Sequence, residues 1–278
     1  MQTALLCAVA WCLLNPISLQ AQNAFEATLA QRLDSLLNTV PVTVQTSTEL
    51  YPNDALQSVM TPTGWGGYGT YVFGGIGGAY PEVYRRNKAD LITYAGVTTG
   101  DFTKFVNAAT SLNMTDVHKF RNFSANFVLS RKLFKGTSVS IGGLQLFANK
   151  KQSDASGSTF YIAFSHAVQT LASQTPGGSK LSYTIGIGTG RFLYKSPKDI
   201  GAGRGKYGTA VFGNISYEIF KHANLNAEWS GMNLGFSFGV RPFKNPLSFG
   251  IGIANLTRYS ADKPGAVFSI GYPLSIKR

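Results

Sequence analysis

The stretch that decides the fold is residues 233–254, NLGFSFGVRPFKNPLSFGIGIA, near the carboxyl end of a chain of 278 residues. It contains two runs in which apolar residues alternate with small or polar ones, separated by a turn rich in Pro, Lys and Asn. The apolar positions are Leu234, Phe236, Phe238 and Val240 in the first run and Leu247, Phe249, Ile251 and Ile253 in the second. Because successive residues of a strand point to opposite faces, this period of two predicts paired strands with one apolar face.

The same alternation extends upstream to about residue 64 and onward to residue 276. We expect twelve strands, at residues 67–78, 89–98, 103–115, 122–131, 137–148, 158–171, 181–192, 208–219, 223–230, 233–241, 246–256 and 265–276. Bacterial single-chain membrane barrels have an even number of strands, and each segment is near the ~9–11 residues that a tilted strand needs to cross a bilayer. A change of phase at Gly142-Gly143 predicts a β-bulge in the fifth strand.

The face opposite the apolar residues distinguishes a membrane barrel from a soluble β-sandwich. Soluble sheets carry bulky polar groups on their outward face, whereas here that face is Gly, Ser, Ala and Asn, and charged residues make up only 14% of the chain. In a transmembrane barrel the apolar residues meet lipid and the other face lines a lumen. Aromatic residues near the strand ends, among them Trp65 and Tyr94, fit interfacial girdles. The predicted fold class is therefore all-β, a transmembrane antiparallel up-and-down β-barrel of about twelve strands with a short N-terminal helix. A soluble β-sandwich or barrel is the alternative.

The first residues have the pattern of an export signal. Residues 4–14 form an unbroken apolar run, and Ala21 supplies a small residue at the expected cleavage point. We predict a signal peptide at residues 1–21 that is cleaved after Sec export, with a buried N-terminal helix as the alternative. Both cysteines, Cys7 and Cys12, lie in this segment, so the mature chain is expected to have neither disulfides nor thiol chemistry.

The mature chain is expected to have two parts. Residues 22–63 are predicted to form an N-terminal helix and an extended segment that either plugs the barrel or lies in the periplasm. Residues 24–37 place apolar side chains at helical spacing, and Pro41 ends that helix. Residues 64–278 are predicted to form the outer-membrane β-barrel.

Several short motifs lie in the second half of the chain. They are Gly188-Thr189-Gly190-Arg191-Phe192, Glu228-Trp229-Ser230-Gly231, Asn233-Leu234-Gly235, Pro246-Leu247 and Ala254-Asn255-Leu256-Thr257. Together they resemble a family of bacterial outer-membrane barrels with a Glu-Trp-x-Gly hairpin, and more distantly YjbH-like barrels. The resemblance covers roughly residues 60–276 and implies a fold and a location, without an activity. The chain lacks the Asp that the family carries in the hairpin, and it ends in Ile276-Lys277-Arg278 where such barrels usually end in an aromatic residue.

The chain is strongly basic, with a formal net charge of +12. Basic residues of the predicted outer loops include Arg85, Arg86, Lys88, Lys198 and Arg204. A basic mouth concentrates anions and would bias a pore toward anionic solutes. The alternative is that these residues neutralise lipopolysaccharide phosphates or keep the loops solvated. Nucleic-acid binding is not expected, because export and lipid-facing strands outweigh the net charge.

The predicted lining of the lumen is small and carries few charges. Its candidate functional residues are Glu218, Glu228, Arg241, Asn214 and Asn226. They are expected either to stabilise the barrel as a polar network or to form a selectivity constriction. Small walls leave volume inside the barrel, and the helix predicted at residues 24–37 is the expected filler.

Catalytic patterns are scarce, so the chain is expected not to be an enzyme, with no catalytic residue, cofactor or metal site. Its histidines are His118, His166 and His222, and Ser165 points to the opposite strand face from His166. No cluster has metal-ligand spacing. The glycines of residues 74–78 precede no Lys-Ser/Thr pair, so they form no phosphate loop.

These features predict a narrow diffusion channel in the bacterial outer membrane that could prefer anions. The alternative is a non-conducting structural or accessory barrel that binds an envelope partner or a surface polysaccharide. Expected partners are outer-membrane lipid and lipopolysaccharide, with small anionic solutes or polysaccharide as further candidates.

Overall fold

The computed structural model of the protein describes residues 49–81, 89–116, 120–148, 158–257, 259–260 and 263–276. All of these belong to one compact unit of the chain, residues 48–278. The predicted signal peptide and the helix predicted at residues 24–37 lie outside the described residues. Among the residues described, no helix combines the length and the apolar character needed to cross a membrane.

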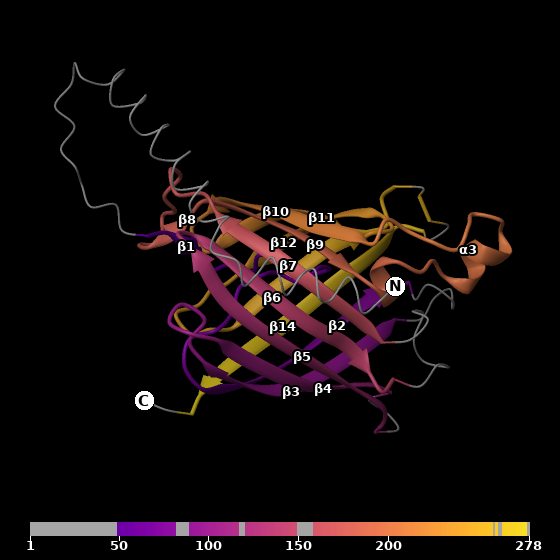
Figure 1. Cartoon of the computed structure of the whole chain (residues 1–278), viewed down its shortest axis with the longest axis horizontal. Coiled ribbons are helices and arrows are strands. Elements are labelled where there is room, and N and C mark those ends of the chain that lie inside the picture. Colours follow the sequence, from indigo (N-terminus) through magenta and orange to yellow (C-terminus); the bar gives the residue numbers. More distant parts are fainter. Residues whose placement is uncertain are drawn as a thin grey trace, which may run out of the picture. The chain divides into compact units, whose positions relative to one another are not determined.

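Twelve strands close into one barrel (Figure 1). In order around the ring they are β2 (Tyr71–Tyr80), β3 (Asp90–Gly100), β4 (Asn107–Asp116), β5 (Arg121–Phe134), β6 (Thr137–Leu146), β7 (Thr159–Ala167), β9 (Leu181–Gly188), β10 (Val211–Phe220), β11 (Ala223–Trp229), β12 (Leu234–Val240), β13 (Ser248–Ala254) and β14 (Gly265–Ser275). Every pairing in the ring is antiparallel, and β14 pairs with β2 to close it, with Ile270 opposite Ile76. The all-β antiparallel barrel of twelve strands predicted from the alternation is confirmed.

The two faces of the barrel wall are reversed relative to a water-soluble protein. On the outer face apolar side chains are exposed, Ile185 to 58% and Ile251 to 61%. On the inner face polar side chains are buried, and Asn224, Asn226 and Glu228 are no more than 1% exposed. Soluble proteins place apolar side chains inside and rarely bury a carboxylate. The apolar residues therefore point outward and the Gly, Ser and Asn positions inward, as the alternation predicts.

A β-bulge interrupts the pairing of β5 with β6. Phe127 lies opposite Gly143 and Ala125 opposite Leu146, so β6 has an extra residue in this interval. Gln145, within the interval, has a positive φ of 53°. The extra residue explains the change of phase seen in the sequence, because it moves the following side chains to the other face.

The two ends of the barrel differ. At the short-turn end, residues 135–136 join β5 to β6 and residues 221–222 join β10 to β11. At the long-loop end, residues 189–210 join β9 to β10. The remaining elements are β1 (Tyr51–Pro52), β8 (Gly178–Ser179), η1 (Gly190–Phe192) and α3 (Pro197–Gly201). Figure 1 shows the parallel β1–β8 pair at the short-turn end and α3 at the long-loop end.

Candidate functional site: the barrel lumen

A segment that precedes the first barrel strand lies inside the barrel. We call residues 53–67 the luminal segment. The Asn53 side-chain amide donates to Asn224 Oδ1 on β11 at 3.0 Å, and the Gly67 N–H donates to Asn107 Oδ1 on β4 at 3.0 Å. The chain next to the barrel therefore fills this part of the lumen, whereas the filler expected from the sequence, residues 24–37, lies outside the described residues.

The turn of the luminal segment closes around the carboxylate of Glu228, at the end of β11. The donors are the N–H groups of Val59, Met60 and Thr61, at 3.0, 2.9 and 3.0 Å, and the hydroxyls of Ser58, Thr61 and Ser237. The Glu228 side chain is only 1% exposed. A buried carboxylate is costly unless hydrogen bonds replace its water, and consecutive backbone N–H groups form a concave anion site that can do so. Glu228 thereby holds the luminal segment against β11.

Glycines on the inner face make room for the luminal segment. A Cβ at Gly239 would lie 2.3 Å from the carbonyl oxygen of Leu56, and a Cβ at Gly235 would lie 2.6 Å from Met60 Cε. Side chains on β12 would therefore push the luminal segment away, which is why glycine is required where the two backbones approach closely. The small lining predicted from the sequence does leave volume, and the luminal segment occupies it here.

Arg241 lies near the short-turn end of the lumen, beside Asp54. His222 Nδ1 lies 2.8 Å from both carboxylate oxygens of Asp54. Arg241 Nη1 lies 3.7 Å from Asp54 Oδ2. The arrangement gives the luminal segment a second attachment, through a carboxylate of its own.

Glu49 attaches the chain just before the luminal segment. Its carboxylate pairs with Lys132 Nζ on β5 and accepts the Gly136 N–H at 2.7 Å. Burial raises the pKa of Glu49, but hydrogen bonds from Lys132, Gly136 and Tyr51 lower it by more, so the pKa lies below the ordinary value of 4.5. The surroundings therefore favour the charged form, which is the form that binds Lys132.

Glu218 is fully buried, and among the described residues its carboxylate accepts hydrogen bonds from outside the luminal segment. It accepts the Ser173 hydroxyl at 2.8 Å and the Gln174 N–H at 3.1 Å. Both donors lie in residues 168–180, the connection between β7 and β9. Glu218 therefore fastens this connection to β10.

The predicted luminal amides do reach the luminal segment. Asn214 donates to the carbonyl oxygen of Gln57 at 3.4 Å, and Asn226 donates to that of Leu56 at 3.3 Å. Asn226 Oδ1 is buried without a hydrogen-bond partner among the described residues. The structure thus brings Asn214, Asn226 and Glu228 together around the luminal segment. Arg241 meets the same segment at Asp54, whereas Glu218 binds residues 168–180.

The predicted basic mouth is described only in part. Arg85, Arg86 and Lys88 lie outside the described residues, and so does the side chain of Lys198. Arg204 Nη1 donates to the carbonyl oxygen of Ser260 at 3.3 Å. Arg204 therefore links the β9–β10 connection to the β13–β14 connection at the long-loop end.

Aromatic residues close the lumen beside β7, β9 and β10. The ring of Phe192, from η1, stacks on Phe212 with centroids 4.2 Å apart, and Tyr161 meets both rings edge-on. A Cβ at Gly186 would lie 2.2 Å from the Phe212 ring. Sequence reasoning did not assign these aromatic residues to the lumen, although Tyr161 and Phe212 occupy inward positions of the alternation.

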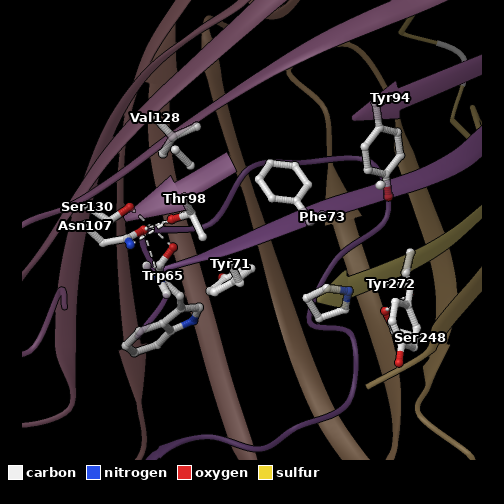
Figure 2. A pocket seen from close by; sticks show the side chains of 16 residues that line it. Trp65, Tyr71, Phe73, Tyr94, Thr98, Asn107, Val128, Ser130, Ser248 and Tyr272 are labelled. Atoms are coloured by element: carbon white, nitrogen blue, oxygen red, sulfur yellow. Dashed lines mark hydrogen bonds between the residues drawn. The ribbon is translucent and has the colours of Figure 1, made fainter. Parts of the chain in front are cut away.

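Two adjoining cavities lie inside the barrel, mainly along β2–β5, with volumes of about 390 and 340 Å³. The larger cavity also reaches β13 and β14. Both are lined by Phe73, Tyr94, Ala109 and Val128. Figure 2 shows Trp65, Phe73 and Tyr94 around the larger cavity. Trp65 belongs to the luminal segment, so that segment forms part of the cavity wall.

The lining of both cavities is uncharged, since it contains no Asp, Glu, Lys, Arg or His. Trp65 and Tyr94 line the larger cavity, which corrects the expectation that they belong to outer aromatic girdles. Trp65 precedes the first barrel strand, and Tyr94 shares the inward face of β3 with Thr98. In the part of the chain that the structure describes, no group of three or more His, Cys, Asp or Glu could hold a metal ion.

Comparisons with known proteins find similarity in fold. No protein-family model matches the chain, and no curated protein matches it. The outer membrane phospholipase A from Escherichia coli aligns at 10% identity over 75% of this chain and 93% of that chain, with a TM-score of 0.39. An active-site mutant of that phospholipase aligns at 11% identity over 79% and 95% of the two chains, with a TM-score of 0.38. The outer membrane protein OprG from Pseudomonas aeruginosa aligns at 10% identity over 77% and 99%, with a TM-score of 0.17.

The expectation that the chain is not an enzyme is contradicted by these comparisons. The outer membrane phospholipase A that it resembles is an enzyme on a barrel scaffold. Catalysis depends on a few side chains placed on a fold and not on the fold itself. The scarcity of histidines was therefore an insufficient reason to exclude catalysis, and at 10% identity the likeness assigns no catalytic residue to this chain.

Proposed function

We propose that this β-barrel lies in the bacterial outer membrane and acts as a narrow diffusion channel. Residues 53–61 occupy the lumen beside β10–β13, whereas the two cavities lie mainly along β2–β5. The single observation that carries the proposal is this pair of adjoining cavities inside a closed barrel. A lumen filled on one side and hollow on the other supports a narrow path for small solutes rather than a wide aqueous pore.

The outer-membrane location is supported by the exposed apolar face. Exposing apolar side chains such as Ile185 and Ile251 to water costs about 25 cal/mol of free energy per Å² of apolar surface, and lipid removes this cost. The proposal includes a signal peptide at residues 1–21 that is cleaved after Sec export. It also includes residues 22–63 as a plug or periplasmic part, residues 64–278 as the barrel, and contacts with outer-membrane lipid and lipopolysaccharide.

An anion preference would have to arise in the outer loops, because the cavity lining is uncharged. We assign it to the basic mouth. Its residues are Arg85, Arg86, Lys88, Lys198 and Arg204. Basic loops raise the local concentration of anions and act on solutes before they enter the barrel.

Kinship with the Glu-Trp-x-Gly hairpin barrels, and more distantly with YjbH-like barrels, is part of the proposal. Residues 228–231 end β11 and begin the turn to β12. Glu228 faces the lumen, whereas Trp229 Nε1 donates to Thr209 Oγ1 at 3.1 Å. The motif thus supplies the carboxylate that holds the luminal segment.

A non-conducting structural or accessory barrel, binding an envelope partner or a surface polysaccharide, is the second candidate function. It is favoured by the hydrogen bonds that hold the luminal segment, above all those to Glu228. A segment bound in this way would keep its side of the lumen closed.

Single-channel recording in planar bilayers tests the proposal. We expect the mature chain, residues 22–278, to give a small conductance and Ala109→Trp to lower it, because Ala109 lines both cavities. Ala108→Trp is the matched control, since Ala108 is the adjacent β4 residue and points to the outer face. Arg204→Glu should shift the reversal potential toward cation selectivity. A folded mature chain that carries no current would select the non-conducting barrel.

A further inference from the structure

We infer that the two adjoining cavities form one binding site for a small uncharged molecule with an aromatic ring and a hydrogen-bonding group. This inference adds an uncharged class of solute to the anions that the basic mouth would attract, and it rests on the proposed channel for its role in transport. Binding itself requires no conduction, so the two ideas can fail separately.

The size of the cavities suits a small organic molecule. Their volumes are about 390 and 340 Å³, within the range of about 300–1,000 Å³ that ligand pockets occupy. Phe73, Tyr94, Ala109 and Val128 line both, so a ligand in one cavity contacts the wall of the other.

The lining offers no binding partner to a dehydrated ion. Its residues carry no formal charge, and the buried carboxylates of Glu218 and Glu228 lie on β10 and β11, where other donors already surround them. An ion that gave up its water to bind here would gain no partner of opposite charge, which is strongly unfavourable, whereas a hydrated ion can pass without binding. The site therefore favours an uncharged ligand.

The aromatic side chains give the site its shape. The ring of Phe73 lies 6.5 Å from that of Tyr94 and 6.4 Å from that of Tyr71, measured between centroids. Trp65 adds a fourth ring from the luminal segment. Rings at offset or edge-on angles can accommodate a further ring, and such contacts add to the free energy of burial.

The Tyr94 hydroxyl is the polar group that remains available. A Cβ at Gly75 would lie 2.4 Å from it and a Cβ at Gly271 3.0 Å from it, so glycines leave the space that it occupies. Asn107, the amide of the larger cavity, is engaged by Thr98 and by backbone groups. No hydrogen bond of the Tyr94 hydroxyl is found within the described part of the chain, so it is free to bind a ligand's polar atom.

Fluorescence of Trp65 provides a direct test. The chain has three tryptophans, and Trp11 lies in the predicted signal peptide, so Trp229→Phe leaves Trp65 as the reporter in the mature chain. Nitrobenzene, an uncharged quencher, is titrated into this protein in detergent. We expect saturable quenching by nitrobenzene. The apparent affinity for 4-nitrobenzoate should be weaker than that for nitrobenzene by about tenfold or more, because a carboxylate resists burial.

Two further variants in the same background locate the site. Ala109→Phe fills space common to both cavities and should weaken nitrobenzene binding by about tenfold, whereas Ala108→Phe on the outer face should leave it unchanged. Tyr94→Phe should weaken it by about fivefold, the effect of one lost hydrogen bond. Circular dichroism and heat-modifiable gel mobility confirm that each variant is folded.

The possible outcomes separate the inference from the channel. Non-saturable quenching, equal binding of 4-nitrobenzoate, or equal binding by folded Ala108→Phe and Ala109→Phe would each overturn the site. Saturable binding by a protein without conductance would overturn the channel and leave the site. Conductance without saturable binding would overturn the site and leave the channel.

Discussion

The backbone N–H and the hydroxyl of Thr61 both donate to the same oxygen of Glu228, at 3.0 and 3.2 Å, across 167 positions of sequence. Thr61 lies at the turn of the luminal segment and Glu228 near the end of β11. Hydrogen bonds to a buried carboxylate are stronger than those between neutral groups. The barrel therefore encloses the luminal segment and also binds its turn through these hydrogen bonds.

Replacing this carboxylate should loosen the luminal segment. In Glu228→Gln the amide keeps one acceptor oxygen and points an N–H group at the donors of the luminal segment. We therefore expect the free energy of unfolding in detergent to fall by about 3 kcal/mol. Chymotrypsin should then cleave after Leu56 or Trp65. Glu218→Gln is the control, because Glu218 holds residues 168–180 instead. Equal cleavage of both variants would contradict a specific role for Glu228.

Acid should release the attachment at Glu49. Its pKa in the folded protein lies below the ordinary 4.5, so the pair with Lys132 contributes stability above that pH and loses it as pH falls through the lowered pKa. We expect the thermal midpoint to fall further between about pH 6 and about pH 3 in the parent protein than in Glu49→Gln.

Other acidic groups act in both proteins, so their difference reports Glu49. The Asp101 carboxyl, for example, has a lowered pKa chiefly because of the Thr103 hydroxyl, and it is present in parent and variant alike. Parallel acid shifts in the two proteins would show that Glu49 contributes nothing.

A disulfide can fix the luminal segment to β13. An ideal Cβ at Gly250 would lie 3.8 Å from Val59 Cβ, a separation typical of disulfides. Val59→Cys combined with Gly250→Cys should therefore oxidise to a cross-link, detected by loss of maleimide labelling, and the single variants serve as controls. The predicted mature chain has no other cysteine.

The same cross-link tests where the solute passes. Because we place the path beside the luminal segment, conductance should be equal in the oxidised and reduced double variant. A current that rises on reduction would mean that the segment must move to open the channel.

The outer face can be tested with two exposed isoleucines. Ile251 on β13 is 61% exposed and Ile200 in α3 is 47% exposed. In a lipid bilayer Ile251→Lys should lower the unfolding free energy by about 2–4 kcal/mol, because the charge enters hydrocarbon. Ile200→Lys should change it by no more than about 0.5 kcal/mol. Indifference to both substitutions would mean that the outer face meets water.

Strand number, strand direction and the inward or outward position of most strand side chains are predictable from the sequence. Residues 246–256 were predicted as a strand, and β13 runs Ser248–Ala254. Alternation is a local property of an extended backbone, so a few residues reveal it. The same alternation also places Tyr94 and Phe212 in the lumen, although the position of Tyr94 near a strand end favoured an aromatic girdle.

The sequence by itself determined that the chain forms a twelve-strand barrel with apolar residues outside, since strands such as β12 and β13 each carry that pattern independently. Only the tertiary structure decided what fills the interior. Contacts such as that of Thr61 with Glu228 have no local signature, because closing the ring brings together residues far apart in the chain. The cavities beside Phe73 and Tyr94 likewise depend on how the luminal segment and the inward side chains share the enclosed volume, which no single strand specifies.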